Sequence, residues 1–99
     1  GEGSAPEETV TALGRDAFLM DAGLAISDIN EELALGIPEG DYQPLAGFIL
    51  DRMGRIPDVG DALEFGDLRF TIRTMERVRI EEVELRRLNS PTVTNRNEA

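Results

Sequence analysis

The sequence predicts an α+β domain in which two helices pack on one face of a twisted, mainly antiparallel sheet of about five strands. Two observations lead to this prediction. Apolar residues recur every four positions at Leu45, Ile49 and Met53, which is the spacing of one helical face. Over residues 63–72 the apolar spacing changes to two, as in a half-buried strand. The predicted element order is β-β-α-α-β-β-β.

The N-terminal half predicts a strand pair and a short helix. Apolar runs at residues 9–13 and 17–21 are separated by a Gly-Arg-Asp sequence, which is typical of a hairpin. A helix over residues 28–35 is expected next, because Ser27 can cap it and its first turn is acidic. Gly36 is expected to end this helix.

A second helix is predicted over residues 44–53. Pro44 suits its first turn, where the missing N–H would have had no helical partner. Gly54 can adopt the left-handed conformation that ends a helix. Pro57 then forces the residue before it into an extended conformation. Residues 58–61, Asp-Val-Gly-Asp, read as a turn into the next strand.

Three strands are expected after this turn. Residues 63–65 and 68–72 alternate on either side of a Gly-Asp pair, which is typical of a two-residue hairpin. In the last strand, residues 80–85, the apolar phase slips, and this predicts a bulge at Glu81-Glu82. Residues 76–78, Glu-Arg-Val, lack the usual Gly, and Val tolerates positive φ poorly. The turn there is therefore predicted to be wider or shifted in register.

The folded domain is expected over residues 9–88. Residues 1–8 are polar and begin with Gly rather than Met, which predicts a flexible segment of an excised or processed fragment. Residues 1–4 read as remnants of an expression vector. Residues 89–99 have no apolar pattern and are expected to form a disordered tail. Periodicity makes five large apolar side chains candidates for the core: Phe18, Phe48, Phe65, Leu68 and Phe70. The alternative is that an exposed subset of them forms a patch for a partner.

The composition excludes several classes of function. The chain contains no Cys, His, Lys or Trp. Disulfides, thiolate zinc sites and cysteine nucleophiles are therefore excluded, as are a Ser-His-Asp triad, a Walker lysine and a Schiff-base lysine. Carboxylate pairs alone lack the companions that acid–base catalysis needs. We expect neither an enzyme nor a cofactor.

The charge balance is strongly acidic. Twenty acidic and ten basic residues give a net charge of −10, which repels phosphate backbones and anionic lipid surfaces. We therefore expect no nucleic-acid partner. The arginines of the late strands alternate with glutamates, which favours cross-strand pairs on a solvated face. The longest apolar run, residues 45–50, is far shorter than the ~20 residues a bilayer requires, so the fragment is expected to be soluble, without membrane insertion.

Four carboxylates are candidate ligands for a hard cation: Asp28, Glu31, Asp58 and Asp61. The first two belong to the acidic start of the short helix, near Asp21 and Glu32. Acidic first turns usually stabilise the helix dipole, and paired Asp residues usually stabilise a turn. These structural roles are the default interpretation, with metal binding as the alternative.

Arg55 follows directly after the predicted end of the second helix. It is expected to bind the last helix carbonyls or to pair with Asp58 or Asp61. The alternative is a place in a binding interface, where Arg is enriched at hot spots.

Three segments carry a resemblance to a known family. They are YQPLAGFIL, GRIPDVGD and LEFGDLRF, and their defining residues are Leu45, Ala46, Gly47, Gly54, Arg55, Pro57, Gly60 and Asp61. Over roughly residues 9–88 the chain resembles the domain that ends CorC/HlyC-type transporter-associated proteins. Pro44 stands where many relatives have Thr.

The resemblance implies a module that follows a pair of CBS domains on the cytoplasmic face of the inner membrane of a bacterium. Family members are linked with Mg²⁺ and Co²⁺ efflux and with haemolysin-like proteins. The implied function is regulatory, through docking on the CBS pair, the membrane domain or a second copy. Two alternatives stay open. One is a sensing module for a small ligand, either a divalent cation or a nucleotide, and the nucleotide is suggested by the similarity of the family fold to part of FAD-binding domains. The other is a plain oligomerisation domain, such as a homodimer.

Overall fold

The computed structural model describes residues 10–40 and 44–88 of the chain. The elements in order are β1 (Val10–Ala12), β2 (Ala17–Asp21), α1 (Ile26–Leu33), α2 (Leu45–Met53), β3 (Ala62–Phe65), β4 (Leu68–Glu76) and β5 (Arg79–Arg87). This confirms the α+β class and the predicted order. The predicted flexible segment at 1–8 and the predicted tail at 89–99 lie outside the described residues.

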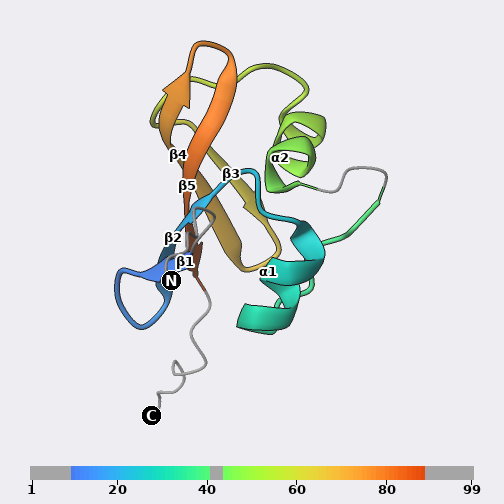
Figure 1. Cartoon of the computed structure of the whole chain (residues 1–99), viewed down its shortest axis with the longest axis vertical. Coiled ribbons are helices and arrows are strands. Elements are labelled where there is room, and N and C mark those ends of the chain that lie inside the picture. The colour runs from blue at the N-terminus through green and yellow to red at the C-terminus, as the bar shows by residue number, and fades with distance from the viewer. Residues whose placement is uncertain (1–9, 41–43, 89–99) are drawn as a thin grey trace, which may run out of the picture.

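All five strands form one antiparallel sheet in the order β1-β2-β5-β4-β3. The hairpin of β4 and β5 is the longest pairing, and β2 joins β5 from the other side. Both helices lie on the same side of the sheet (Figure 1). The opposite face of the sheet carries no helix among the described residues.

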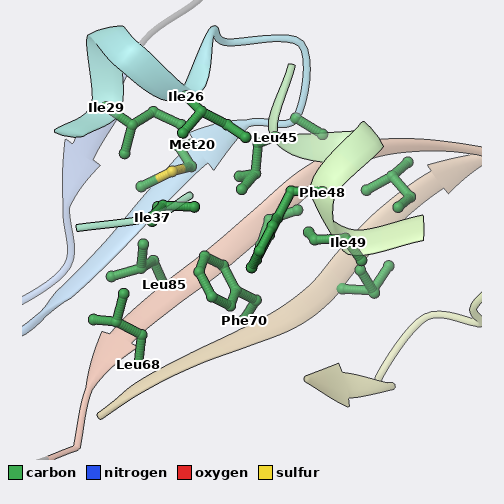
Figure 2. Close-up of a cluster of buried hydrophobic side chains, with 14 residues drawn as sticks. Met20, Ile26, Ile29, Ile37, Leu45, Phe48, Ile49, Leu68, Phe70 and Leu85 are labelled. Carbon is green, nitrogen blue, oxygen red and sulfur yellow. The ribbon is translucent and has the colours of Figure 1, made fainter. Parts of the chain in front are cut away.

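The core lies between the two helices and the face of the sheet that they cover (Figure 2). Phe48 of α2 is fully buried, and its ring centroid is 5.5 Å from that of Phe65 and 5.7 Å from that of Phe70. Both ring pairs have the edge-to-face geometry that the aromatic quadrupole favours. Among the predicted core residues, Phe48, Leu68 and Phe70 are buried, while Phe18 and Phe65 are partly buried and pack against the cluster.

The uncovered face carries the predicted pairs of arginine and glutamate. Arg69 binds Glu64 across β3 and β4 at 2.7 Å. Glu84 of β5 accepts hydrogen bonds from Arg73 and Arg86. Burial by itself would raise the pKa of Glu84, but these two arginines outweigh it and leave the pKa below its ordinary value. The interleaved charges of the late strands are therefore largely paired with one another.

The start of α1 differs from the prediction. Ser27 was expected as the N-cap, but Ala25 holds that position, in an extended conformation and without a side-chain cap. The amides of Asp28 and Ile29 donate to the Ala25 carbonyl. Ile26, the first helical residue, is 1% exposed. Burial of Ile26 sets the start of the helix and overrides the local preference of Ser for a cap.

The end of α1 also differs. Gly36 was expected to stop the helix, but Ala34 takes the left-handed conformation, with φ 57°. The side chain of Asn30 donates to the Ile37 carbonyl at 2.8 Å and accepts from the Ile37 amide at 2.9 Å. Ile37 is buried in the core. The chain has to turn back before Gly36 to make this pairing, so the prediction from Gly36 was wrong.

Two predictions about β3 and α2 were off by one residue. Pro44 is the N-cap of α2, one position before the helix itself. β3 begins at Ala62 rather than at Leu63. The other end of α2 is as predicted, because Gly54 caps it with φ 72° and donates its amide to the Leu50 carbonyl.

The turn between β4 and β5 is tighter than predicted. Glu76 pairs with Arg79, which leaves a turn of two residues, so the expectation of a wider turn was wrong. The positive φ falls on Arg77, at 59°, and Val78 is not among the residues with positive φ. The β-branched Val78 therefore does not occupy the position with positive φ, where it would be strained.

The predicted bulge in β5 is present. Thr74 pairs with Glu82 and Met75 with Ile80, which leaves Glu81 without a partner in the β4–β5 ladder. A second irregularity was not predicted: Ile72 pairs with Val83 and Thr74 with Glu82, so Arg73 of β4 has no paired residue in the β4–β5 ladder. The sequence does carry a signal for it, because the inward-facing residues Ile72 and Met75 are three positions apart rather than two.

Candidate functional site

The strongest candidate site is the loop from Gly54 to Asp61, which joins α2 to β3. It carries five of the eight family residues of the sequence. Gly54 turns the chain out of the helix, and Pro57 then places its ring in the buried interior. Asp58 and Asp61 close the loop with a turn in which the Asp61 amide donates to the Asp58 carbonyl at 3.0 Å. The predicted turn over residues 58–61 is thus confirmed.

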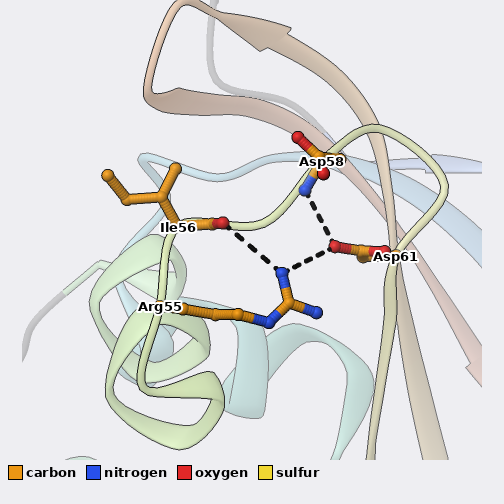
Figure 3. A network of polar contacts seen from close by, with 4 residues as sticks. All are labelled: Arg55, Ile56, Asp58 and Asp61. Atoms are coloured by element: carbon orange, nitrogen blue, oxygen red, sulfur yellow. Dashed lines mark hydrogen bonds and ion pairs between the residues drawn. The ribbon is translucent and has the colours of Figure 1, made fainter.

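The side chain of Asp61 organises this loop (Figure 3). One carboxylate oxygen accepts the Asp58 amide at 2.9 Å and a guanidinium N–H of Arg55 at 3.0 Å. The same nitrogen of Arg55 lies 3.4 Å from the Ile56 carbonyl oxygen. The predicted pairing of Arg55 with an aspartate of the turn is confirmed for Asp61. The amide of Asp58, and then Arg55, holds the pKa of Asp61 below its ordinary value.

The loop is also tied to the sheet. The Gly60 amide donates to the Ile72 carbonyl, and the Ile72 amide donates to the Asp61 carbonyl, both at 2.8 Å. Gly60 has φ 97°, a conformation that residues with a side chain rarely adopt. The backbone between Pro57 and Asp61 is therefore fixed at three points: the buried proline, the carboxylate and β4.

This fixed backbone presents apolar side chains to solvent. Ile56 is 54% exposed and Val59 is 60% exposed. Isolated exposed apolar residues are common on proteins, but these two flank a buried proline on a loop held in one conformation. Such a surface loses little conformational entropy when a partner covers it. We call Ile56 and Val59 the apolar pair of the loop.

The four candidate metal ligands do not form one site. Asp28 and Glu31 lie on α1, whereas Asp58 and Asp61 lie in the loop. Within residues 10–40 and 44–88, no three acidic side chains converge in a way that could hold a metal ion. Asp61 already binds an amide and a guanidinium. Metal binding by these four carboxylates stays a prediction.

One contact beside the loop was missed in the sequence. The guanidinium of Arg52, in the last turn of α2, lies 4.8 Å from the ring centroid of Phe65 and 5.7 Å from that of Phe48. The spacing of four between Phe48 and Arg52 places both on one helical face and was a usable signal. The contact to Phe65 depends on the sheet and carries no local signal. Together these contacts hold the end of α2 against β3.

Nothing in the described part of the chain has the length and hydropathy of a transmembrane helix.

Comparison with known proteins identifies relatives across most of the chain. The transporter associated domain (CorC_HlyC) matches residues 11–89. A solved CorC_HlyC domain from a Xylella fastidiosa hemolysin, in complex with Mg²⁺ and Mn²⁺, is 34% identical, with a TM-score of 0.66 over 74% of this chain and 89% of that one. The transporter associated domain of a CBS domain protein from Porphyromonas gingivalis is 25% identical, with a TM-score of 0.70 over 81% of this chain and 98% of that one.

Curated relatives are much longer than this chain. The polyamine export protein of Escherichia coli is 27% identical over 90 residues, which are 89% of this chain and 20% of that protein. The chain therefore spans about a fifth of that relative. The family model covers residues 11–89, and the two solved domains are matched over 89% and 98% of their own length. These domains are accessory modules rather than catalytic ones. The chain belongs to the CorC_HlyC family of transporter associated domains.

Proposed function

We propose that this domain is a docking module on the cytoplasmic face of a bacterial inner-membrane transporter, where it modulates export of divalent cations such as Mg²⁺ or Co²⁺. The partner we propose is the CBS-domain pair of the same protein, next to its membrane domain. The family match and the CBS domain protein of P. gingivalis support this partner. The name of the E. coli relative makes polyamines an alternative cargo.

The observation that carries the proposal is the apolar pair of the loop. The side chains of Ile56 and Val59 are exposed, and hydrogen bonds to Asp61 and to β4 fix the backbone of the loop that carries them. Burying apolar side chains against a partner contributes about 25 cal/mol per Å². Docking regulates transport when the CBS pair binds the domain with different affinity in its two ligand states, because only a differential affinity shifts an equilibrium.

The test is a double variant, Ile56→Ser with Val59→Ser, titrated against the purified CBS pair by calorimetry. We expect at least about tenfold weaker binding, which corresponds to about 1.4 kcal/mol. The matched control is Leu13→Ser, since Leu13 is 50% exposed and lies in the β1–β2 hairpin, away from the loop. Equal weakening by the control, or unchanged binding of the double variant, would exclude the loop as the docking surface. Deleting the domain should alter the cation dependence of transport while transport itself persists.

Direct binding of a divalent cation is the second candidate, because the X. fastidiosa domain was solved with Mg²⁺ and Mn²⁺. Thermal unfolding of the chain with Mg²⁺, Mn²⁺ and Co²⁺ tests it, with ATP, AMP and FAD covering the nucleotide alternative. A ligand at 100 times its dissociation constant stabilises the folded state by about 2.7 kcal/mol. For a domain of this size that raises Tm by about ten degrees or more. If no compound raises Tm, both ligand classes are rejected. Sedimentation at several protein concentrations separately tests the homodimer.

A further inference from the structure

The two free edges of the sheet differ in charge. The strand order leaves β1 at one edge and β3 at the other. β3 carries Glu64 and lies between Asp61 and Asp67 in the sequence. Residues 10–14 and 17–20, which include β1 and most of β2, contain no charged residue and no proline. Proteins usually protect a free edge with charges, proline or a bulge, and β1 is protected only by its length of three residues.

The backbone of β1 directs some of its hydrogen-bonding groups to this free edge. The Leu13 amide donates to the Ala17 carbonyl at 2.8 Å, so these two residues form a hydrogen-bonded pair. Such pairs alternate along an antiparallel ladder, which makes Thr11 the next residue of β1 that is bonded to β2. The amides and carbonyls of Val10 and Ala12 therefore point away from β2. Within the part of the chain that the structure describes, nothing pairs with them.

We propose that β1 pairs with β1 of a second copy of this chain, in antiparallel orientation, about a two-fold axis at Thr11. In this register Val10 of one copy lies opposite Ala12 of the other, and each exchanges its amide and carbonyl with its partner. Thr11 then lies opposite Thr11 of the other copy. The two sheets become one continuous sheet, and the outward groups of β1 are all paired in both copies.

The side chains suit this register. Thr11 is exposed and pairs with Leu19, so it lies on the uncovered face of the sheet, where a pair of threonines across two strands is favourable. Val10 pairs with the buried Met20 and packs partly against the core on the helix side. The second copy would cover more of Val10 and of the exposed Ala12, which buries further apolar surface.

The charge distribution favours a second copy at β1 rather than at β3. Two chains with a net charge of −10 repel each other. Pairing through β3 would bring the acidic residues of that edge together, and like charges directly opposite each other are destabilising. Pairing through β1 brings uncharged strands together and leaves only repulsion over longer distances. Salt screens such repulsion, so this dimer should become tighter as the salt concentration rises.

The dimer should be weak and reversible. Three residues of strand pairing make an interface well below the roughly 1,200 Å² that stable complexes bury. The loop from Gly54 to Asp61 leads into β3, at the opposite edge of the sheet, so the dimer leaves the apolar pair of the loop exposed. The inference therefore goes beyond docking on the CBS pair and does not depend on it.

The first test is a cysteine cross-link, because the chain has no Cys of its own. Thr11 and its copy would form a non-hydrogen-bonded pair, in which the Cα atoms are about 4.5 Å apart. A disulfide spans Cα distances of roughly 4.4–6.8 Å. Thr11→Cys should therefore form a disulfide-linked dimer under mild oxidation. Ala62→Cys, at an exposed position of β3, is the matched control and should remain monomeric.

The second test is sedimentation equilibrium of the chain at protein concentrations up to about 1 mM. We expect a reversible dimer whose Kd falls at least about threefold between 0.05 and 0.5 M NaCl. Thr11→Glu places two carboxylates opposite each other and should raise Kd about fivefold. Ala62→Glu adds the same charge at the other edge and should leave Kd unchanged. Thermal unfolding checks that both glutamate variants fold.

Three results would overturn the inference: a chain that stays monomeric at every concentration, equal cross-linking of the two cysteine variants, or equal weakening by the two glutamate variants. Docking is separable from dimerisation in the same set of proteins. Thr11→Glu should bind the CBS pair as tightly as the parent chain does. The double variant at Ile56 and Val59 should form the dimer normally, so failure of docking and failure of this interface are distinguishable.

Discussion

The two helices both end on a left-handed residue, but they are held there differently. α2 ends at Gly54, which adopts that conformation at little cost. α1 ends at Ala34, where a Cβ makes it unfavourable. Distant contacts compensate: Arg87 of β5 donates to the Leu33 carbonyl at 2.7 Å, and Asn30 binds the backbone of Ile37. The end of α2 is specified locally, whereas the end of α1 depends on the folded domain.

Because the end of α2 is specified locally, the tertiary contacts of this helix come mainly from its core face, and substitutions on that face should be the most costly. Phe48→Ala removes a fully buried ring that contacts Phe65 and Phe70. We expect a loss of about 3–5 kcal/mol in the free energy of unfolding, measured with urea. Leu50→Ala, on the same helix at 37% exposure, is the control and should cost less than about 1.5 kcal/mol. Similar losses for both variants would contradict the proposed packing.

If the end of α1 depends on tertiary contacts, removing one of them should be costly. Asn30→Ala deletes two hydrogen bonds and leaves the amide and carbonyl of the buried Ile37 without these partners. We expect a loss of about 2 kcal/mol, together with faster hydrogen exchange at Ile37. Glu31→Ala, an exposed neighbour on the same helix, should change stability by less than about 0.5 kcal/mol. Unchanged exchange at Ile37 in the Asn30 variant would argue against this role.

Exchanging the two left-handed residues tests the comparison directly. Gly54→Ala places a Cβ at φ 72° and should destabilise the domain by about 1 kcal/mol. Ala34→Gly relieves the strain at φ 57° but adds entropy to the unfolded chain, so a net gain of about 0.5 kcal/mol is expected. Apart from Gly54 itself and its two neighbours in the chain, no atom lies within 4 Å of the position that a Cβ would take, so the first effect is conformational rather than steric. Thermal unfolding of both variants should give shifts of opposite sign.

The same contrast explains what the sequence could predict. Gly54, Pro57 and Gly60 act through their own backbone preferences, so the end of α2 and the following turn were predictable. The pairing of Arg55 with an aspartate was also predictable, because the loop is short. Both ends of α1 were mispredicted, since burial of Ile26 and of Ile37 decides them.

The smallest expected effect concerns the pH dependence of the contacts that Asp61 makes in the loop from Gly54 to Asp61. The pKa of Asp61 is lowered first by the Asp58 amide and then by Arg55. The folded pKa therefore lies below the unfolded value of about 3.9. A depressed carboxylate pKa stabilises the folded state fully above the unfolded pKa, and this stabilisation is lost as the pH falls through the folded pKa. The stability difference between the parent chain and Asp61→Asn should thus be constant above about pH 5 and shrink below about pH 4.

Arg55→Met separates the two causes. Because the Asp58 amide is the larger one, the pKa of Asp61 should rise in this variant but stay below about 3.9, as measured by carboxyl ¹³C NMR. Arg15→Met removes an exposed guanidinium from the β1–β2 hairpin without touching the loop and serves as the control for net charge. A full return of the Asp61 pKa to its ordinary value would show that Arg55 alone holds the carboxylate. In that case the conformation of the loop would depend on the exposed ion pair of Arg55 and Asp61. High salt as well as low pH would then weaken that ion pair and make the loop less ordered.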